Sequence, residues 1–68
     1  MTNTNMLKSK IVLFGDTQNA LAEHLGISRQ SLSAKINGEK SFTQPEIKKI
    51  IVRYQLNENE TDLIFFND

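Results

Sequence analysis

The chain has no cysteine and no tryptophan, only one proline and three glycines, and no long run of apolar residues. The lack of cysteine excludes disulfides and thiolate metal sites, and it fits a reducing compartment better than secretion. The opening segment, MTNTNMLKSK, is polar and lacks the apolar core of an export signal. No stretch reaches the length of a membrane-spanning helix. These absences predict a cytoplasmic protein that does not enter a membrane.

Signatures of catalysis and of cofactor binding are also missing. The sequence contains no phosphate-cradling glycine loop, no pair of histidines and no Ser–His–acid set anchored by a strained turn. His24 is the single histidine, and without cysteines it has no partners for a metal site. We therefore expect no enzymatic activity, no cofactor, no metal and no small-molecule substrate.

Charge is balanced in total but not along the chain. The formal net charge is zero, from eight basic and eight acidic residues. Residues 1–53 hold all eight bases and four of the acids, a charge of +4, whereas residues 54–68 hold the other four acids and no base. Electrostatic attraction is local, because physiological salt screens it over about 8 Å. A basic body can therefore still bind a polyanion on one face.

Apolar residues recur every three or four positions, which is typical of amphipathic helices, and no segment sustains the alternation of a strand. Each of the first three such sets ends at a glycine suited to a left-handed helix cap, namely Gly15, Gly26 and Gly38. Residues 43–46, TQPE, match a capping box that begins a fourth helix. Asn57 and Glu60 indicate a fifth. The sequence predicts a single all-α domain, residues 1–68, of four to five short helices.

The segment QNALAEHLGISRQSLSAKING, residues 18–37, contains two of these helices, separated by a very short turn. Thr17 is placed to cap the first helix and Ser28 to cap the second. Ile27 is placed to pack against Leu32 as a hydrophobic staple, which fixes the angle between the helices. Together these features are typical of a helix-turn-helix unit.

The second helix of this unit has a polar outer face. With Leu32 and Ile36 as the buried edge, the opposite face consists of Gln30, Ala34 and Asn37, with Ser31 and Ser33 beside it and Arg29 in the first turn. Arginine suits guanine and glutamine suits adenine in the major groove of DNA. Small residues let the backbone approach the bases, and the helix N-terminus favours a phosphate.

The segment FGDTQNALAEHLGISRQSLSAKINGEK resembles the phage repressor and Cro family of helix-turn-helix proteins, over roughly half the chain. The resemblance implies a lambda-repressor-like DNA-binding domain with residues 18–37 at its centre. It implies base reading by Arg29, Gln30, Ser33 and Ala34. It implies phosphate contacts by Gln18, by Asn37 and by Lys40 of the following loop. We add Ser31 and Lys35 to the phosphate contacts, because both adjoin this face in sequence.

One position departs from the family pattern. The family usually has an apolar residue three positions after the one represented by Leu32, whereas this chain has Lys35 there and Ile36 next. The shift implies a slightly rotated recognition helix. It leaves open whether Ser33, Ala34 or Lys35 faces the bases.

Four apolar residues in a row, residues 63–66, close the predicted last helix. They cannot all face inward from one helix, because successive residues point about 100° apart. They either complete the small core or form a seam between two copies. We predict a mixture, with Phe65 or Phe66 at a dimer interface.

These features together favour sequence-specific binding of double-stranded DNA by a small regulator in a bacterial or phage-infected cell. One short helix reads few base pairs, so we expect a homodimer on a pseudo-palindromic operator with half-sites about 34 Å apart. The sequence does not distinguish a repressor from an activator. The alternative is that the chain uses this same fold to bind another protein, as an antirepressor-like or antitoxin-like module. The zero net charge favours this alternative.

Overall fold

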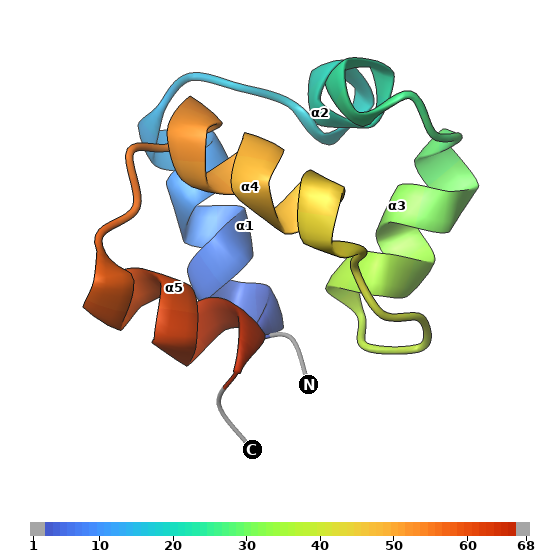
Figure 1. Cartoon of the computed structure of the whole chain (residues 1–68). Helices are drawn as coiled ribbons and strands as arrows, with labels where there is room; N and C mark the ends of the chain where they lie inside the picture. The colour runs from blue at the N-terminus through green and yellow to red at the C-terminus, as the bar shows by residue number, and fades with distance from the viewer. Residues whose placement is uncertain (1–2, 67–68) are drawn as a thin grey trace.

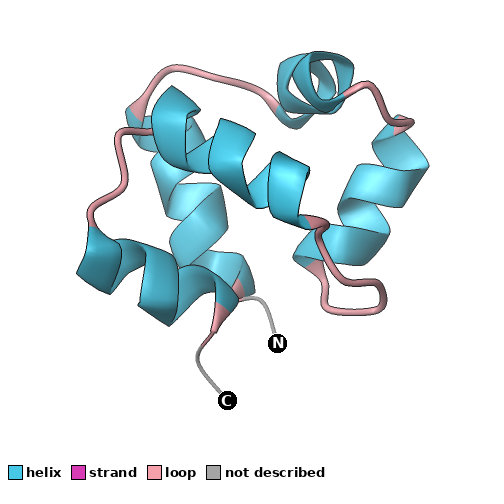
Figure 2. Ribbon diagram, viewed as in Figure 1, coloured by secondary structure: helices cyan, strands magenta, loops and turns pink. Residues whose placement is uncertain are grey.

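The computed structural model describes residues 3–66, which form five α-helices and no strand (Figures 1 and 2). The helices are α1 Thr4–Leu13, α2 Gln18–Leu25, α3 Arg29–Ile36, α4 Gln44–Arg53 and α5 Glu58–Phe65. The all-helical prediction is therefore confirmed, at the upper end of the expected number. Across the described residues, no helix has both the length and the apolar character needed to cross a membrane.

Each helix begins at a polar side chain that accepts a hydrogen bond from the backbone amide three residues on. These residues are Asn3, Thr17, Ser28, Thr43 and Asn57. The Glu46 and Glu60 carboxylates bond back to the cap amides of α4 and α5, which completes a capping box at each. Such caps satisfy amides that have no partner inside the helix. The predicted caps are confirmed, and Asn3 adds one that was not predicted.

The glycines end or follow helices in the left-handed conformation, as predicted. Gly26 caps α2 with φ 73°, and its amide donates to the Glu23 carbonyl at 3.1 Å. Gly15 and Gly38 also have positive φ. Gln55, just after α4, adopts φ 52° without being a glycine, which costs an L-residue free energy. The turns between helices are thus set by local backbone chemistry.

The hydrophobic core lies where all five helices meet, and α4 crosses the middle of the molecule (Figure 1). Its most deeply buried side chains are Leu7, Leu21, Leu32, Ile36, Ile50, Tyr54 and Ile64. Full burial of one such aliphatic side chain contributes about 1.5–3 kcal/mol. Because the chain is short, each of these residues carries a large share of the stability.

The first helix is joined to both α5 and α3. The Asn3 amide donates to the Ile64 carbonyl at 2.7 Å, and Lys10 forms an ion pair with Glu60. The Thr4 hydroxyl donates to the Ile36 carbonyl at 2.6 Å. The Thr4 bond thus ties the C-terminal end of α3 to α1, while the other two contacts tie α1 to α5.

The apolar end of the chain divides between core and surface. Phe65 is only 7% exposed and packs edge-on against Phe42, with ring centroids 5.5 Å apart. Its ring fills the core, so of the two residues predicted for a dimer interface only Phe66 is exposed. Phe66 is 54% exposed and Leu63 is 37% exposed. The four residues do not all face inward, as expected.

Candidate nucleic-acid interface

Helices α2 and α3 form the pair predicted for residues 18–37, joined by a turn of residues 26–28. Figure 1 looks along α2 and across α3, so their axes meet at a steep angle. The Ile27 amide donates to the Ala22 carbonyl at 3.0 Å, and the Ile27 side chain packs on the core cluster that contains Leu32. Ser28 then caps α3. These contacts fix the direction in which α3 leaves the turn.

Helix α3 has a buried edge and a polar outer face. Leu32 and Ile36 are almost completely buried. Arg29, Gln30 and Asn37 are exposed, whereas Ser31, Ser33 and Ala34 are half-buried. The helix contains no acidic residue. A polyanion that approaches the outer face is therefore not repelled by any negatively charged side chain of α3 itself.

Arg29 and Ser33 interact on the outer face of α3. The Arg29 Nη1 donates a hydrogen bond to the Ser33 hydroxyl one turn further along the helix. A guanidinium has five N–H donors, so four remain for other acceptors. The contact directs the Arg29 side chain along the face and gives it a defined position.

Lys35 points toward α4 and away from the outer face. Its ammonium lies 2.6 Å and 2.7 Å from the two carboxylate oxygens of Glu46, and the side chains are 12% and 11% exposed. Burial would raise the pKa of Glu46, but the hydrogen bonds from Lys35 and the Thr43 amide lower it on balance. Glu46 is thus a carboxylate that neutralises Lys35.

This ion pair explains why Lys35 stands where the phage repressor and Cro family usually has an apolar residue. Lys35 takes the inward position where an apolar residue was expected, and Glu46 balances the charge that it buries. We therefore withdraw Lys35 from the predicted phosphate contacts. The choice of a central base-facing residue narrows to Ser33 and Ala34. The sequence predicted Glu46 only as a member of the capping box, and its second role as the partner of Lys35 was missed.

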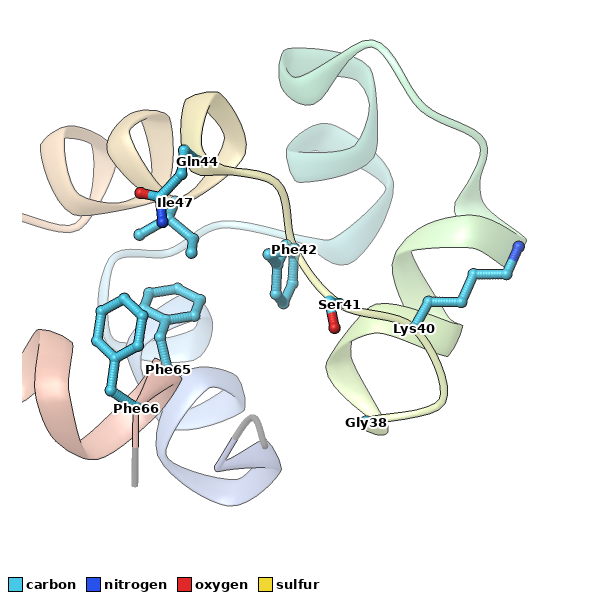
Figure 3. Close-up of a pocket in the computed structure, with 8 residues that line it drawn as sticks. All are labelled: Gly38, Lys40, Ser41, Phe42, Gln44, Ile47, Phe65 and Phe66. Carbon is cyan, nitrogen blue, oxygen red and sulfur yellow. The ribbon is translucent and has the colours of Figure 1, made fainter. Parts of the chain in front are cut away.

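The loop after α3 is tied to the end of that helix. The Ala34 carbonyl accepts hydrogen bonds from the Glu39 and Lys40 amides, at 2.8 Å and 3.2 Å. The Lys40 side chain is exposed. In Figure 3 it points away from the aromatic side chains that the loop faces. Lys40 thus supplies a cation beside the C-terminal end of α3.

A cavity of about 200 Å³ lies between this loop and the end of α5 (Figure 3). Its lining includes Phe42, Ile47, Phe65 and Phe66. The cavity faces the interior side of the loop, so it is separate from the outer face of α3. Within residues 3–66, no three His, Cys, Asp or Glu side chains come together as metal ligands would.

Gln18 is the first residue of α2, next to the Thr17 cap. Its side chain is half-buried. The Thr17 hydroxyl accepts from the Ala20 amide at 3.0 Å. The other amides of this first turn have no partner inside the helix, which makes the start of α2 suited to a phosphate.

Three of the eight cations are used inside the fold. Besides Lys10 and Lys35, Arg53 donates to Asp16 from Nε and Nη2 at 2.7 Å and 3.0 Å. Tyr54 also donates to Asp16, at 2.6 Å. The Arg53 hydrogen bond holds the pKa of Asp16 well below its ordinary value. This network fixes the α1–α2 connection to α4, and it could not be predicted from the sequence because its members are far apart in the chain.

The other five cations form no ion pair within the described residues: Lys8, Arg29, Lys40, Lys48 and Lys49. Arg29 lies in the first turn of α3, and Lys40 lies just beyond its last turn. The outer face of α3 therefore runs between two cations that are available to a ligand.

Searches among curated proteins and among solved structures found no match. A family described as "Protein of unknown function (DUF739)" does match, over residues 3–68. This description names no activity and no ligand, so the resemblance to phage repressors stays a prediction. Because the match spans almost the whole sequence, the chain belongs to the DUF739 family.

Proposed function

We propose that the protein binds double-stranded DNA by laying α3 in the major groove, and that it regulates transcription at an operator. The observation that carries this proposal is the outer face of α3, which is polar, free of acids and flanked by Arg29 and Lys40. A helix presented in this way fits the width of the major groove.

In this proposal the bases are read from the outer face of α3. Arg29 has donors left to bind guanine, and the exposed amide of Gln30 can form two hydrogen bonds with adenine. Ser33 and Ala34 are small, which lets the backbone come close to the base edges. Specificity therefore depends chiefly on the first turn of α3.

Phosphates are bound around this face by Gln18, Ser31, Asn37 and Lys40. Gln18 and Ser31 lie in the first turns of α2 and α3, where backbone amides and the helix dipole attract an anion. Lys40 adds a full positive charge from the loop. Such contacts set the position of the protein on the duplex without reading its sequence.

The protein acts as a homodimer on a pseudo-palindromic site, so that two α3 helices read half-sites about 34 Å apart. Regulation is steric in this scheme, because a bound dimer excludes polymerase from the promoter. No catalytic step and no cofactor takes part. The scheme places the protein with DNA in the cytoplasm.

Selection of bound sequences from random duplex DNA, followed by a salt titration on the best site, tests this function. We expect the logarithm of the affinity to fall steeply with the logarithm of the salt concentration, because phosphate contacts release counterions. The selected sites should be pseudo-palindromic. Absence of duplex binding at low salt would overturn the proposal.

A second candidate is a module that binds another regulator, as an antirepressor or antitoxin does. It is favoured by exposed apolar side chains outside the helix pair, such as Val12 and Val52, which are 76% and 77% exposed. Exposed apolar side chains are available for contact with a protein partner. The same salt titration separates the two candidates, since a module that binds only proteins should show no salt-dependent binding to duplex DNA.

A further inference from the structure

We propose that a second copy of the chain docks on the outer side of the α1–α5 junction, through a surface that is complementary to itself. The inference deepens the dimer of the proposed function and rests on it. The prediction of Phe65 or Phe66 as a dimer residue named only the end of the chain, and of the two only Phe66 is exposed. The structure points instead to a surface built from two helices.

Exposed apolar side chains are distributed unevenly over the molecule. Among residues 3–66, the large hydrophobic residues that are exposed are Val12, Leu13, Phe14, Val52, Leu63 and Phe66. All belong to α1, α4 or α5, or directly follow one of them, and none belongs to α2 or α3. Helix α5 and the C-terminal end of α1 lie on the side away from α3 (Figure 1). A partner on that side leaves α3 open.

The Lys10–Glu60 ion pair marks the line along which α1 and α5 meet. Successive residues of a helix are rotated by about 100° around its axis. The residues met on going around each helix from the ion pair toward the solvent therefore follow in a fixed order. On α1 the order is Leu13, Ser9, Val12 and Lys8, which we call the α1 face. On α5 the order is Leu63, Asn59, Phe66 and Asp62, which we call the α5 face. All eight residues are exposed in the structure.

The two faces match each other position by position. Each has a leucine beside the ion pair, a second apolar residue further out, and a charged residue at its outer edge. Leu13 is 72% exposed, and a shallow depression runs along the α1 face past Val12 and Lys8. The edge charges have opposite signs, Lys8 on α1 and Asp62 on α5. The surface is thus basic at one edge, apolar in the middle and acidic at the other edge.

A two-fold axis that lies above the Lys10–Glu60 pair, outside the molecule and parallel to α1 and α5, brings the α1 face of each copy onto the α5 face of the other. Lys8 then meets Asp62 of the second copy, because the helices are antiparallel and both residues lie two positions from the ion pair toward the same end of the α1–α5 junction. Each contact occurs twice, as in any isologous dimer. The apolar side chains in the middle leave water, while the charges pair at the rim.

Charge decides the occupant. Lys8 and Asp62 have no ion-pair partner within residues 3–66. An acidic partner protein would pair with the α1 face but would face like charge at the α5 face. Two α1 faces packed together would oppose Lys8 to Lys8, which is unfavourable. A second copy in the two-fold arrangement pairs both edges.

The test measures self-association of the full chain without DNA, by sedimentation equilibrium from about 1 μM to about 1 mM. We expect Lys8→Glu and Asp62→Lys each to raise the dimer Kd about tenfold, since each change places like charges together. The double variant should return the Kd to near the wild-type value, because it exchanges the two charges. Lys49→Glu, on α4, is the matched control and should leave the Kd unchanged.

A second variant tests the apolar centre. Leu13→Glu should raise the dimer Kd at least about tenfold, and it should fold normally because Leu13 is largely exposed. Circular dichroism and thermal melting verify the fold. A chain that is monomeric at every concentration would overturn the inference. The inference would also be overturned if none of these substitutions changed the dimer Kd, or if the double variant had a Kd as high as that of the single variants.

The outcomes separate this inference from the proposed function. A monomer that still binds its selected duplex overturns the docking surface and leaves DNA binding standing. A dimer that responds to the charge exchange but never binds duplex DNA supports the surface and overturns DNA binding. Gln30→Ala, on the outer face of α3, should change DNA affinity without changing the dimer Kd.

Discussion

The ammonium of Lys35 lies 2.6 Å and 2.7 Å from the two carboxylate oxygens of Glu46, and this ion pair joins α3 to the first turn of α4. Glu46 also accepts from the Thr43 amide at 2.9 Å, so one carboxylate serves both the α4 cap and the α3 contact. Because both side chains are nearly buried, each depends on the other for its charge balance.

Lys35→Met should therefore lower the free energy of unfolding by about 2–4 kcal/mol, since it leaves the Glu46 charge buried without a cation. Glu46→Gln should cost less, because its amide oxygen can still accept from Lys35 and Thr43. The double variant Lys35→Met with Glu46→Leu should recover part of the loss. Urea denaturation measures all three. Equal stability of Lys35→Met and wild type would contradict the role of the pair.

Stability should fall in acid. The Arg53 hydrogen bond lowers the pKa of Asp16 from 3.8, and the pKa of Glu46 is lowered from 4.5. A carboxyl whose pKa is lower in the folded state stabilises the fold above its unfolded pKa, and loses this effect as pH falls through the folded pKa. Unfolding free energy should thus be flat between pH 7 and about pH 5 and decline below about pH 4.

Asp16→Asn is the control for this pH dependence. It should be less stable than wild type at pH 7, because Arg53 and Tyr54 lose their anionic partner. It should also decline less steeply in acid. Urea denaturation across the pH range gives both results, and an unchanged acid slope in Asp16→Asn would rule out a contribution of Asp16.

Phe65→Ala and Phe66→Ala should differ sharply, although the residues are neighbours. Phe65 is buried against Phe42, so its removal leaves a cavity and should cost about 3–5 kcal/mol. Phe66 is half-exposed, so its replacement by alanine should lower the free energy of unfolding by less than about 1 kcal/mol. The comparison needs thermal or urea denaturation at a concentration where the chain is monomeric. Similar losses would show that Phe66 also fills the core.

Backbone strain offers a second matched pair. Gly26→Ala should destabilise by about 1 kcal/mol, because φ 73° strains a residue with a Cβ even though nothing lies within 4 Å of it. Gln55→Gly should stabilise slightly, by about 0.5 kcal/mol, because Gln55 holds φ 52°. Changes of melting temperature in opposite directions would verify both. A stabilised Gly26→Ala would exclude strain at this cap.

The proposed DNA contacts predict two kinds of variant. Arg29→Ala and Gln30→Ala should each cost about 1–3 kcal/mol on the selected site and relax its sequence preference. Lys40→Ala should weaken all duplexes alike and reduce the salt slope by about 1. Binding assays on the selected site and on a scrambled duplex measure both effects.

Lys8→Ala is the control for these contacts, because Lys8 is also an unpaired exposed cation but lies on α1. On a single half-site it should leave the affinity and the salt slope unchanged. Equal loss on both duplexes for Gln30→Ala would remove it from base reading.

Local signals predicted most of the fold. Caps and glycine stops depend on residues within one turn of each other, so Thr17, Ser28, Gly26 and the Thr43 capping box could be found in the sequence alone. Contacts between distant residues could not. Lys35 was placed on the DNA side because only the fold brings Glu46 to it.

Phe65 illustrates the same limit from the apolar side. The sequence showed that residues 63–66 could not all be buried, but not which of them would be. That choice depends on the position of Phe42 in the α3–α4 loop, to which Phe65 packs. The outer face of α3 was easier to predict, because helical spacing alone separates it from Leu32 and Ile36.

The bonds that join α1 to α5 also constrain when the protein can assemble during its synthesis. Asn3 bonds to Ile64 and Lys10 pairs with Glu60, so α1 cannot complete its contacts until α5 has been synthesised. Translation adds about 5–20 residues per second, so this delay lasts several seconds. During that interval Leu7 and Ile11 lack the side chains of α5 that complete the core cluster to which they belong.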